Sequence, residues 1–176
     1  SLPPVCPFLY IGSLSSLCQL LLYNTNERYL RDKDFDVSRF EWVKDYAEIH
    51  DNKRKIVLMH YPVFCYNGQF RRGPDGTPLT YMLHGHIHKT EDQVLVDRFC
   101  VQTRATMRKS AHQETAQPVP CQMINCFCMY SDYTPLTLEE WVECDQKRRG
   151  RADRGGTLQC ALDMFSEDFM SDGRSQ

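Results

Sequence analysis

The sequence predicts an α/β fold in which mixed β-sheets are flanked by helices. Two short apolar runs, Lys55–His60 and Tyr81–His84, have the length and composition of strands buried on both faces, as in a parallel or mixed sheet. Glu91–Met107 and a segment that begins at Thr137 show helix-like spacing instead. Strands and helices of these kinds together favour an α/β domain.

Composition limits the kinds of protein this chain can be. Its 176 residues suffice for one domain, and hydrophobic and charged fractions of 41% and 25% are ordinary for a globular protein. A net charge of −2 creates no overall field that would recruit nucleic acid or an anionic membrane, so nucleic acid is conceivable only as a substrate. No run of 18 apolar residues occurs, and we expect no membrane partner.

The cysteines indicate the compartment. All nine are scattered along the chain, and Cys126 and Cys128 stand inside an apolar run. Secreted disulfide frameworks are usually short chains with an even number of cysteines. We therefore predict reduced cysteines that pack in the core of a cytoplasmic protein.

Loops separate the expected strands and helices. Charged or turn-forming residues predict three of them, over Tyr29–Asp36, Asn67–Pro78 and Ser110–Pro120. Between the first two lies Ser38–Tyr46, whose mixed apolar pattern suits a short segment packed on a sheet. Gln122–Tyr130 is again strand-like.

The first expected helix covers Glu91–Met107. Five of its residues recur at helix-like spacing and predict an amphipathic helix. They are Val94, Leu95, Arg98, Phe99 and Gln102.

The second expected helix opens with a capping box, Thr137 followed three residues later by Glu140. Its apolar face is Leu138, Trp141 and Val142. Gly150 is expected to end it, which places the basic run Lys147, Arg148 and Arg149 where the helix dipole favours cations. The polar remainder, Arg151–Gln176, is expected to be a poorly ordered tail.

Histidines stand at the ends of the two predicted strands. His60 ends the first, and Gly85-His86-Ile87-His88 follows the second, while His84 is interpreted as structural. Imidazole is the commonest metal ligand, and glycine lets the backbone turn tightly enough for two imidazoles to converge. Taken singly, each of these histidines also suits an exposed or hydrogen-bonded side chain.

Together, the segments KIVLMHYP and YMLHGHIHKT resemble the last two motifs of the calcineurin-like metallophosphoesterases, above all the small bacterial and phage-type enzymes. In that family an apolar strand ends in a metal-binding histidine, and a later strand ends in Gly-His-x-His. The resemblance covers about Glu27–Arg149 and implies a hydrolase of phosphoesters. Its fold would pack two mixed sheets between helices.

The resemblance also implies a ligand set. His60 and His86 would bind one divalent metal and His88 a second, and Asn24 would match the family's metal-binding asparagine. Mn, Fe, Zn or Ni would all suit such ligands. The paired metals would polarise the phosphoryl oxygens and generate the attacking hydroxide.

Two further residues are candidates for binding the substrate. Arg71 and Arg72 lie in the loop after His60, where guanidinium groups could contact a phosphoester. A solvated loop is the alternative reading of the same pair.

The chain departs from the family in its N-terminal part. The family's Asp-x-His and Gly-Asp motifs are absent, and Thr25 stands where the family has a histidine. Residues 1–26 contain no charged residue, and our hypothesis is a frameshifted or misjoined stretch that replaces the N-terminal half of the fold. Without bridging carboxylates, two dications would repel each other, so we predict weak binding of a single metal.

Three functions are open on the sequence alone. The first is a metal-dependent phosphoester hydrolase, carried by residues 27–149. The second is a catalytically inactive fragment that retains partial metal binding. The third is a Cys/His zinc-binding module that uses cysteines such as Cys126.

Overall fold

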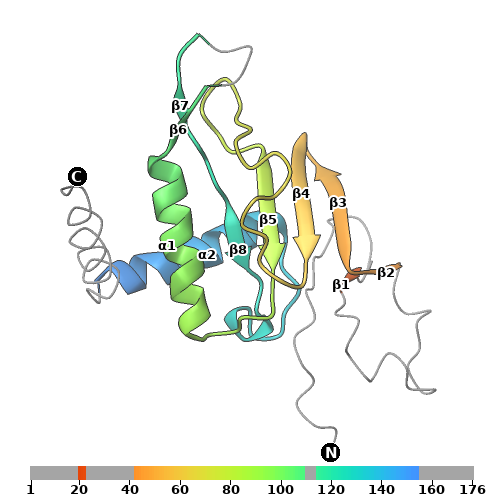
Figure 1. The fold of residues 1–176 in the computed structure, drawn as a ribbon. Coiled ribbons are helices and arrows are strands. Elements are labelled where there is room, and N and C mark those ends of the chain that lie inside the picture. Colours follow the sequence, from red (N-terminus) through yellow and green to blue (C-terminus); the bar gives the residue numbers. More distant parts are fainter. Residues whose placement is uncertain (1–19, 23–41, 110–113, 155–176) are drawn as a thin grey trace, which may run out of the picture.

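The computed structural model describes residues 20–22, 42–109 and 114–154 of the chain (Figure 1). Its centre is a four-stranded sheet in the order β3-β4-β5-β8. These strands are Tyr46–Asp51, Arg54–Met59, Thr80–His84 and Met123–Asn125. β3 runs antiparallel to β4, whereas β4, β5 and β8 are parallel, so the sheet is mixed as predicted.

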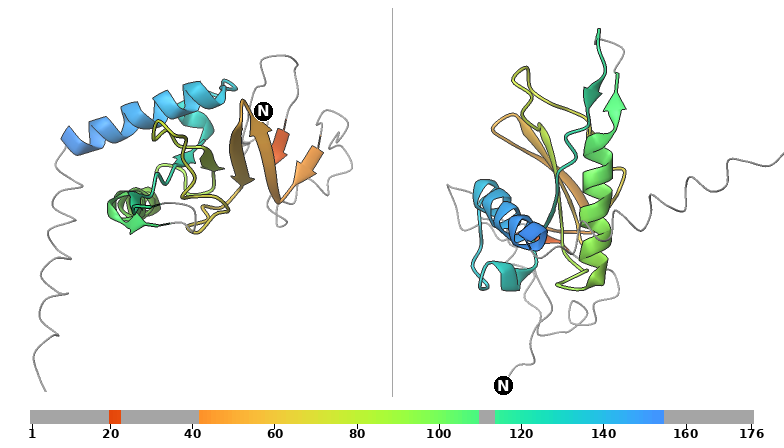
Figure 2. Two further views of the ribbon diagram at one scale, coloured as in Figure 1. Left: turned by 90° about the horizontal axis from the view of Figure 1, so that it is seen from above. Right: turned by 90° about the vertical axis from the view of Figure 1, so that its left-hand side faces the viewer.

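Two helices cover opposite faces of this sheet, α1 over Glu91–Ala105 and α2 over Leu138–Arg154 (Figure 2). The α/β architecture is thereby confirmed. Side chains alternate between the faces, since Leu58 and Leu83 pack with Trp141 of α2 while Met82 packs with Val96 of α1.

Smaller elements surround the central sheet. β1 (Leu20–Leu22) pairs with β2 (Trp42–Lys44) in parallel, and β6 (Met107–Arg108) pairs with β7 (Gln117–Pro118) in antiparallel fashion. No helix in the described parts of the chain is long and apolar enough to cross a membrane. Asn24, the loop Tyr29–Asp36 and residues 155–176 lie outside the described residues.

Strand β3 was not anticipated. It forms a hairpin with β4 through a turn in which Asn52 and Lys53 both have positive φ, 47° and 68°. Turns of that kind match the twist of two antiparallel strands. The residues Asp51 and Asn52 before the apolar run of β4 are typical of a turn. The strand before them was hard to recognise, because β3 contains few apolar residues to show an alternating pattern.

The strand predicted over Gln122–Tyr130 is mostly wrong. Only Met123–Asn125 forms a strand, and Cys128–Tyr130 forms a 3-10 helix. The side chain of Asn125 accepts a hydrogen bond from the backbone N–H of Phe127 at 3.1 Å, which turns the chain away from the sheet. The loop predicted over Ser110–Pro120 likewise contains β7.

Helix α1 begins where predicted and ends two residues earlier. Its buried face differs from the predicted set, because Leu95 is 56% exposed and Val96 and Cys100 are buried. Gln93 and Asp97 are buried too, and polar residues on the inner face hid the true periodicity.

Helix α2 opens with the predicted capping box. The Thr137 N–H donates to Glu140 Oε2 at 2.7 Å, and the Glu140 N–H donates to Thr137 Oγ1 at 3.3 Å. Leu138 and Trp141 are buried as expected. Gly150 does not end the helix, which continues to Arg154, so the first four residues assigned to the tail, 151–154, are helical instead.

The basic run of α2 is not a set of exposed cations at a helix end. Arg148 and Arg149 each pair with Asp97 of α1 and with Asp145, and all four contacts measure 2.7 Å. We call these four residues the α1–α2 ion network. Asp97 lies about fifty residues before the two arginines, so the spacing of residues within α2 could not predict the network.

Candidate metal centre

The candidate site lies where two neighbouring parallel strands end. His60 follows β4, and the segment Gly85–His88, here called the histidine turn, follows β5 (Figure 1). The carboxyl ends of parallel strands share one edge of a sheet, so residues 26 positions apart meet there. The Gly85 N–H donates to the His60 carbonyl at 3.0 Å and fixes the two segments together.

The histidine turn bends at its histidines. His86 and His88 have φ values of 61° and 49°, in the left-handed region that non-glycine residues rarely adopt. The role expected for Gly85 is not observed, since this glycine has no positive φ and its missing Cβ would meet only ordinary contacts at 3.8 Å or more. Ile87, buried in the core on the α1 side, anchors the turn between the two strained histidines.

His60 and His86 form a close pair. Nδ1 of His86 lies 3.2 Å from Nε2 of His60, and the ring of Tyr61 contacts His86 with centroids 4.2 Å apart. Two nitrogens that each bind one cation at about 2.1 Å, at an angle between tetrahedral and octahedral, are about 3.0–3.4 Å apart. The separation suits two ligands of one metal, and in this structure it is a hydrogen bond between the two rings.

His60 is prepared to donate its lone pair. Its side chain is buried, and burial followed by the nearby His86 and His88 lowers its pKa from 6.5 to about 4. At neutral pH the imidazole is thus uncharged, which is the form that binds metals.

His88 has other contacts. Its ring stacks on Phe127 with centroids 4.7 Å apart and an interplanar angle of 14°. Its carbonyl accepts a hydrogen bond of 2.7 Å from Asn125 Nδ2, which also donates to Gln93 of α1. These contacts hold the end of the histidine turn against β8 and α1.

The described residues bring together two candidate ligands, not a full coordination shell. Among residues 20–22, 42–109 and 114–154, no three His, Cys, Asp or Glu side chains are grouped closely enough to hold a metal. The donors fit a divalent metal in kind and spacing, and a complete site needs further ligands. The predicted ligand Asn24 lies outside the described residues.

His84 lies beneath the site as a structural residue. It is fully buried, its Nδ1 lies 3.2 Å from the Gly85 carbonyl, and its Nε2 has no partner among the described residues. Burial lowers its pKa to about 4, so this histidine is neutral as well.

The two predicted substrate-binding arginines are not beside the histidines. Between β4 and β5 the chain returns to the other end of the sheet. There Arg72 forms an isolated antiparallel β-bridge with Pro78, just before β5 begins. The five residues of β5 span roughly 15 Å. Arg71 and Arg72 therefore lie near the opposite end of the strands from His60.

The cysteines are poor candidates for a zinc cluster. Cys126 is buried and donates to the Ile124 carbonyl at 3.8 Å, and burial raises its pKa well above the usual value. Burial also raises the pKa of Cys128. Both thiols thus favour the protonated form, which is not the form that binds zinc.

Three residues around the site were not foreseen. Tyr61, Asn125 and Phe127 orient the histidines through ring and hydrogen-bond contacts. Tyr61 could have been suspected, because it follows His60 directly. Asn125 and Phe127 come from β8 and its end, and no local pattern links them to the histidine turn.

The chain matches no protein-family model, no curated protein and no solved structure. The geometry of the site and the sequence motifs are accordingly the basis for its interpretation.

Proposed function

We propose that this chain is a metal-dependent phosphoester hydrolase of the metallophosphoesterase type, or the metal-binding half of one, and that His60 and His86 bind the same divalent cation. The observation that carries the proposal is the 3.2 Å separation of His86 Nδ1 and His60 Nε2 at one edge of a parallel sheet. The motif order, strand context and spacing support the same assignment.

The chain's own residues prepare this chemistry. Burial keeps His60 neutral, while Tyr61 and the Asn125 hydrogen bond orient the histidine turn. A bound divalent metal supplies polarisation of a phosphoryl oxygen and a water of lowered pKa. His88, close enough to affect the pKa of His60, is the candidate ligand for a second cation.

We expect weak binding of one metal and impaired turnover. Two imidazoles leave a divalent cation short of ligands, and the sequence lacks the carboxylate motifs of the family. We also propose a cytoplasmic location, because the described cysteines, six in number, are all unbridged.

Metal binding is the first test. Titration calorimetry of the full chain with Mn²⁺, Zn²⁺ and Ni²⁺ should give one site that His86→Ala or His60→Ala weakens. Even outer partners of a metal ligand are worth about 10-fold in affinity, so loss of one of two ligands should exceed that.

A matched control exists on the same sheet. His50 is an exposed histidine of β3, paired with Lys55 at the far end of β4. His50→Ala removes the same chemical group, and the titration should be unaffected. Equal metal affinity in the His86→Ala and His50→Ala variants would contradict the proposal.

Turnover separates the remaining alternatives. Hydrolysis of 4-nitrophenyl phosphate or of its diester with added Mn²⁺, lost in His86→Ala, would support the enzyme. Metal binding without any turnover would favour an inactive fragment. Zinc that survives His86→Ala but is lost with Cys126→Ala would identify a Cys/His module instead.

A further inference from the structure

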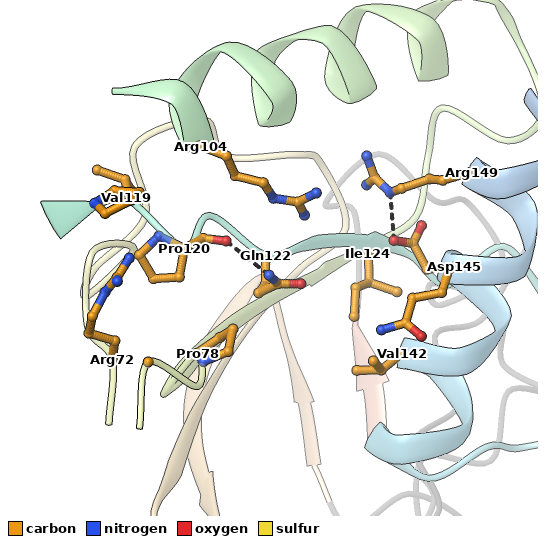
Figure 3. A pocket seen from close by; sticks show the side chains of 13 residues that line it. Arg72, Pro78, Arg104, Val119, Pro120, Gln122, Ile124, Val142, Asp145 and Arg149 are labelled. Atoms are coloured by element: carbon orange, nitrogen blue, oxygen red, sulfur yellow. Dashed lines mark hydrogen bonds and ion pairs between the residues drawn. The ribbon is translucent and has the colours of Figure 1, made fainter. Parts of the chain in front are cut away.

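A cavity opens away from the histidines, between α1, α2 and the segment that leads into β8 (Figure 3). Its volume is about 390 Å³, within the usual range of small-molecule pockets. Arg104 of α1, Arg149 of α2 and Arg72 of the loop before β5 all line it. None of the histidines does.

We propose that this cavity binds a phosphomonoester dianion, with the phosphate between Arg104 and Arg149 and the organic group against the apolar wall. This is a site separate from the proposed metal centre. Its basis is an excess of positive charge, a set of uncommitted guanidinium donors and a wall of suitable shape.

The charge excess follows from the ion pairs. Arg148 and Arg149 are balanced by Asp97 and Asp145 within the α1–α2 ion network. No salt bridge among the described residues joins Arg104 or Arg72 to a carboxylate. The cavity lining therefore holds three guanidinium groups and one carboxylate, Asp145, which pairs with Arg149. The net charge of these four groups is positive and would match the negative charge of a phosphomonoester.

The donors are oriented and partly unused. Arg104 Nε donates to the Cys121 carbonyl at 3.0 Å, and no hydrogen bond to its terminal nitrogens is found within the described residues. Arg149 is held by Asp145, Asp97 and the Met123 carbonyl, which occupy three of its five N–H groups. Figure 3 shows the two guanidinium groups reaching into the same space from α1 and α2.

The rest of the wall favours an organic ligand over a bare ion. Pro78, Pro120, Ile124 and Val142 line the cavity beside the arginines. Proline lacks a backbone N–H, so Pro78 and Pro120 present apolar surface there. The backbone N–H of Gln122, another lining residue, donates to Tyr66 Oη at 2.7 Å, which fixes the position of this part of the wall.

Binding should be measured on the full chain with phenyl phosphate, in EDTA so that no metal is present. The expected result is saturable binding, weaker by about 10-fold or more in Arg104→Gln, because one charge-assisted hydrogen-bonded group is lost. Arg72→Gln, a change at the partly exposed rim, should reduce affinity less. Arg108→Gln removes the same charge from β6 outside the cavity and should have no effect.

Two further probes test the class of ligand. Phenyl sulfate has the same shape but one negative charge, and it should bind at least several-fold more weakly. Inorganic phosphate should also bind more weakly, because it cannot contact the apolar wall. Equal affinity for phosphate and phenyl phosphate would overturn the phosphomonoester assignment.

Two outcomes would overturn the site itself. One is the absence of binding at millimolar phenyl phosphate, and the other is unchanged affinity in Arg104→Gln. Binding that persists in His86→Ala would show that this site is independent of the metal centre. Failure of either proposal can thus be recognised without reference to the other.

Discussion

The histidine turn and the α1–α2 ion network bring ionisable side chains together in different ways. The turn brings two imidazole rings together at a partly exposed sheet edge, through residues that end two neighbouring strands. The network joins four charged groups between two helices, with side chains between 6% and 17% exposed. The first arrangement holds two imidazole nitrogens 3.2 Å apart at the sheet edge, whereas the charges of the second neutralise one another.

The comparison teaches that clustered ionisable groups have different consequences for stability and function. A buried ion pair depends on every member, because removing one leaves an unpaired charge. The histidine turn carries backbone strain at His86 and His88 and contributes little packing from its exposed His86. Mutations should therefore separate the two regions.

The largest effect is expected from Asp97→Ala. This carboxylate accepts from Arg148, Arg149 and Gln93, and its loss leaves two largely buried guanidinium groups with Asp145 as their one remaining carboxylate in the α1–α2 ion network. The free energy of unfolding should fall by about 3–5 kcal/mol, measured by urea denaturation.

Glu143→Ala is the matched control for Asp97→Ala. It breaks an ion pair of α2 with Lys147 in which both side chains are mostly exposed, and it should cost less than about 1 kcal/mol. Equal losses in the two variants would show that the α1–α2 ion network does not stabilise the fold.

Acid should destabilise the protein through His84, which lies between the two regions. Its pKa is about 4 in the folded chain and 6.5 in the unfolded chain, so the unfolded chain binds more protons in that interval. Stability should therefore fall as the pH drops from 6.5 towards 4, by about 3 kcal/mol from this residue.

The measurement is urea denaturation at several pH values, for the native chain and for His84→Gln. The glutamine variant cannot take up the proton, so its stability should change less over the same interval. An identical pH dependence in both chains would exclude His84 as the cause.

A smaller loss is expected from Thr137→Ala at the start of α2. The capping box would lose the hydroxyl that accepts from the Glu140 N–H, at a cost of about 1 kcal/mol. Thr134→Ala, a change at an exposed threonine outside the helix, should hardly alter the thermal midpoint. Equal shifts would mean that the cap is not formed in solution.

The smallest effect on stability, and the opposite sign, is expected from His86→Gly. Glycine adopts a φ of 61° without steric cost, so the unfolding free energy should stay equal or rise by up to about 1 kcal/mol. Metal affinity should nevertheless be lost. Lys89→Gly, at an exposed position without positive φ, should destabilise and leave metal binding intact.

The sequence predicted those parts of the fold that depend on short segments. Ile56, Val57 and Leu58 are buried because an apolar run of that length fills a strand covered on both faces. Thr137 and Glu140 formed their box for the same local reason. The meeting of His60 with His86 was also predictable, because adjacent parallel strands end at one edge.

Features that join distant segments could not be predicted in this way. Asp97 of α1 is buried because it pairs with Arg148 and Arg149 of α2. The sequence of either helix alone does not indicate this pairing. The arginine-lined cavity assembles Arg72, Arg104 and Arg149 from three separate elements. The stacking of Phe127 on His88 depends on where β8 turns, which Asn125 decides through one hydrogen bond.

The β3–β4 hairpin has a consequence for the order in which the site assembles. Its two strands are joined by a two-residue turn, and hairpins of this kind close within microseconds. We therefore expect the hairpin that ends at His60 to form early, and His86 to reach it only when β5 pairs with β4 across the long intervening segment. A cation held by both histidines would therefore act on the rate of unfolding rather than on the first steps of folding.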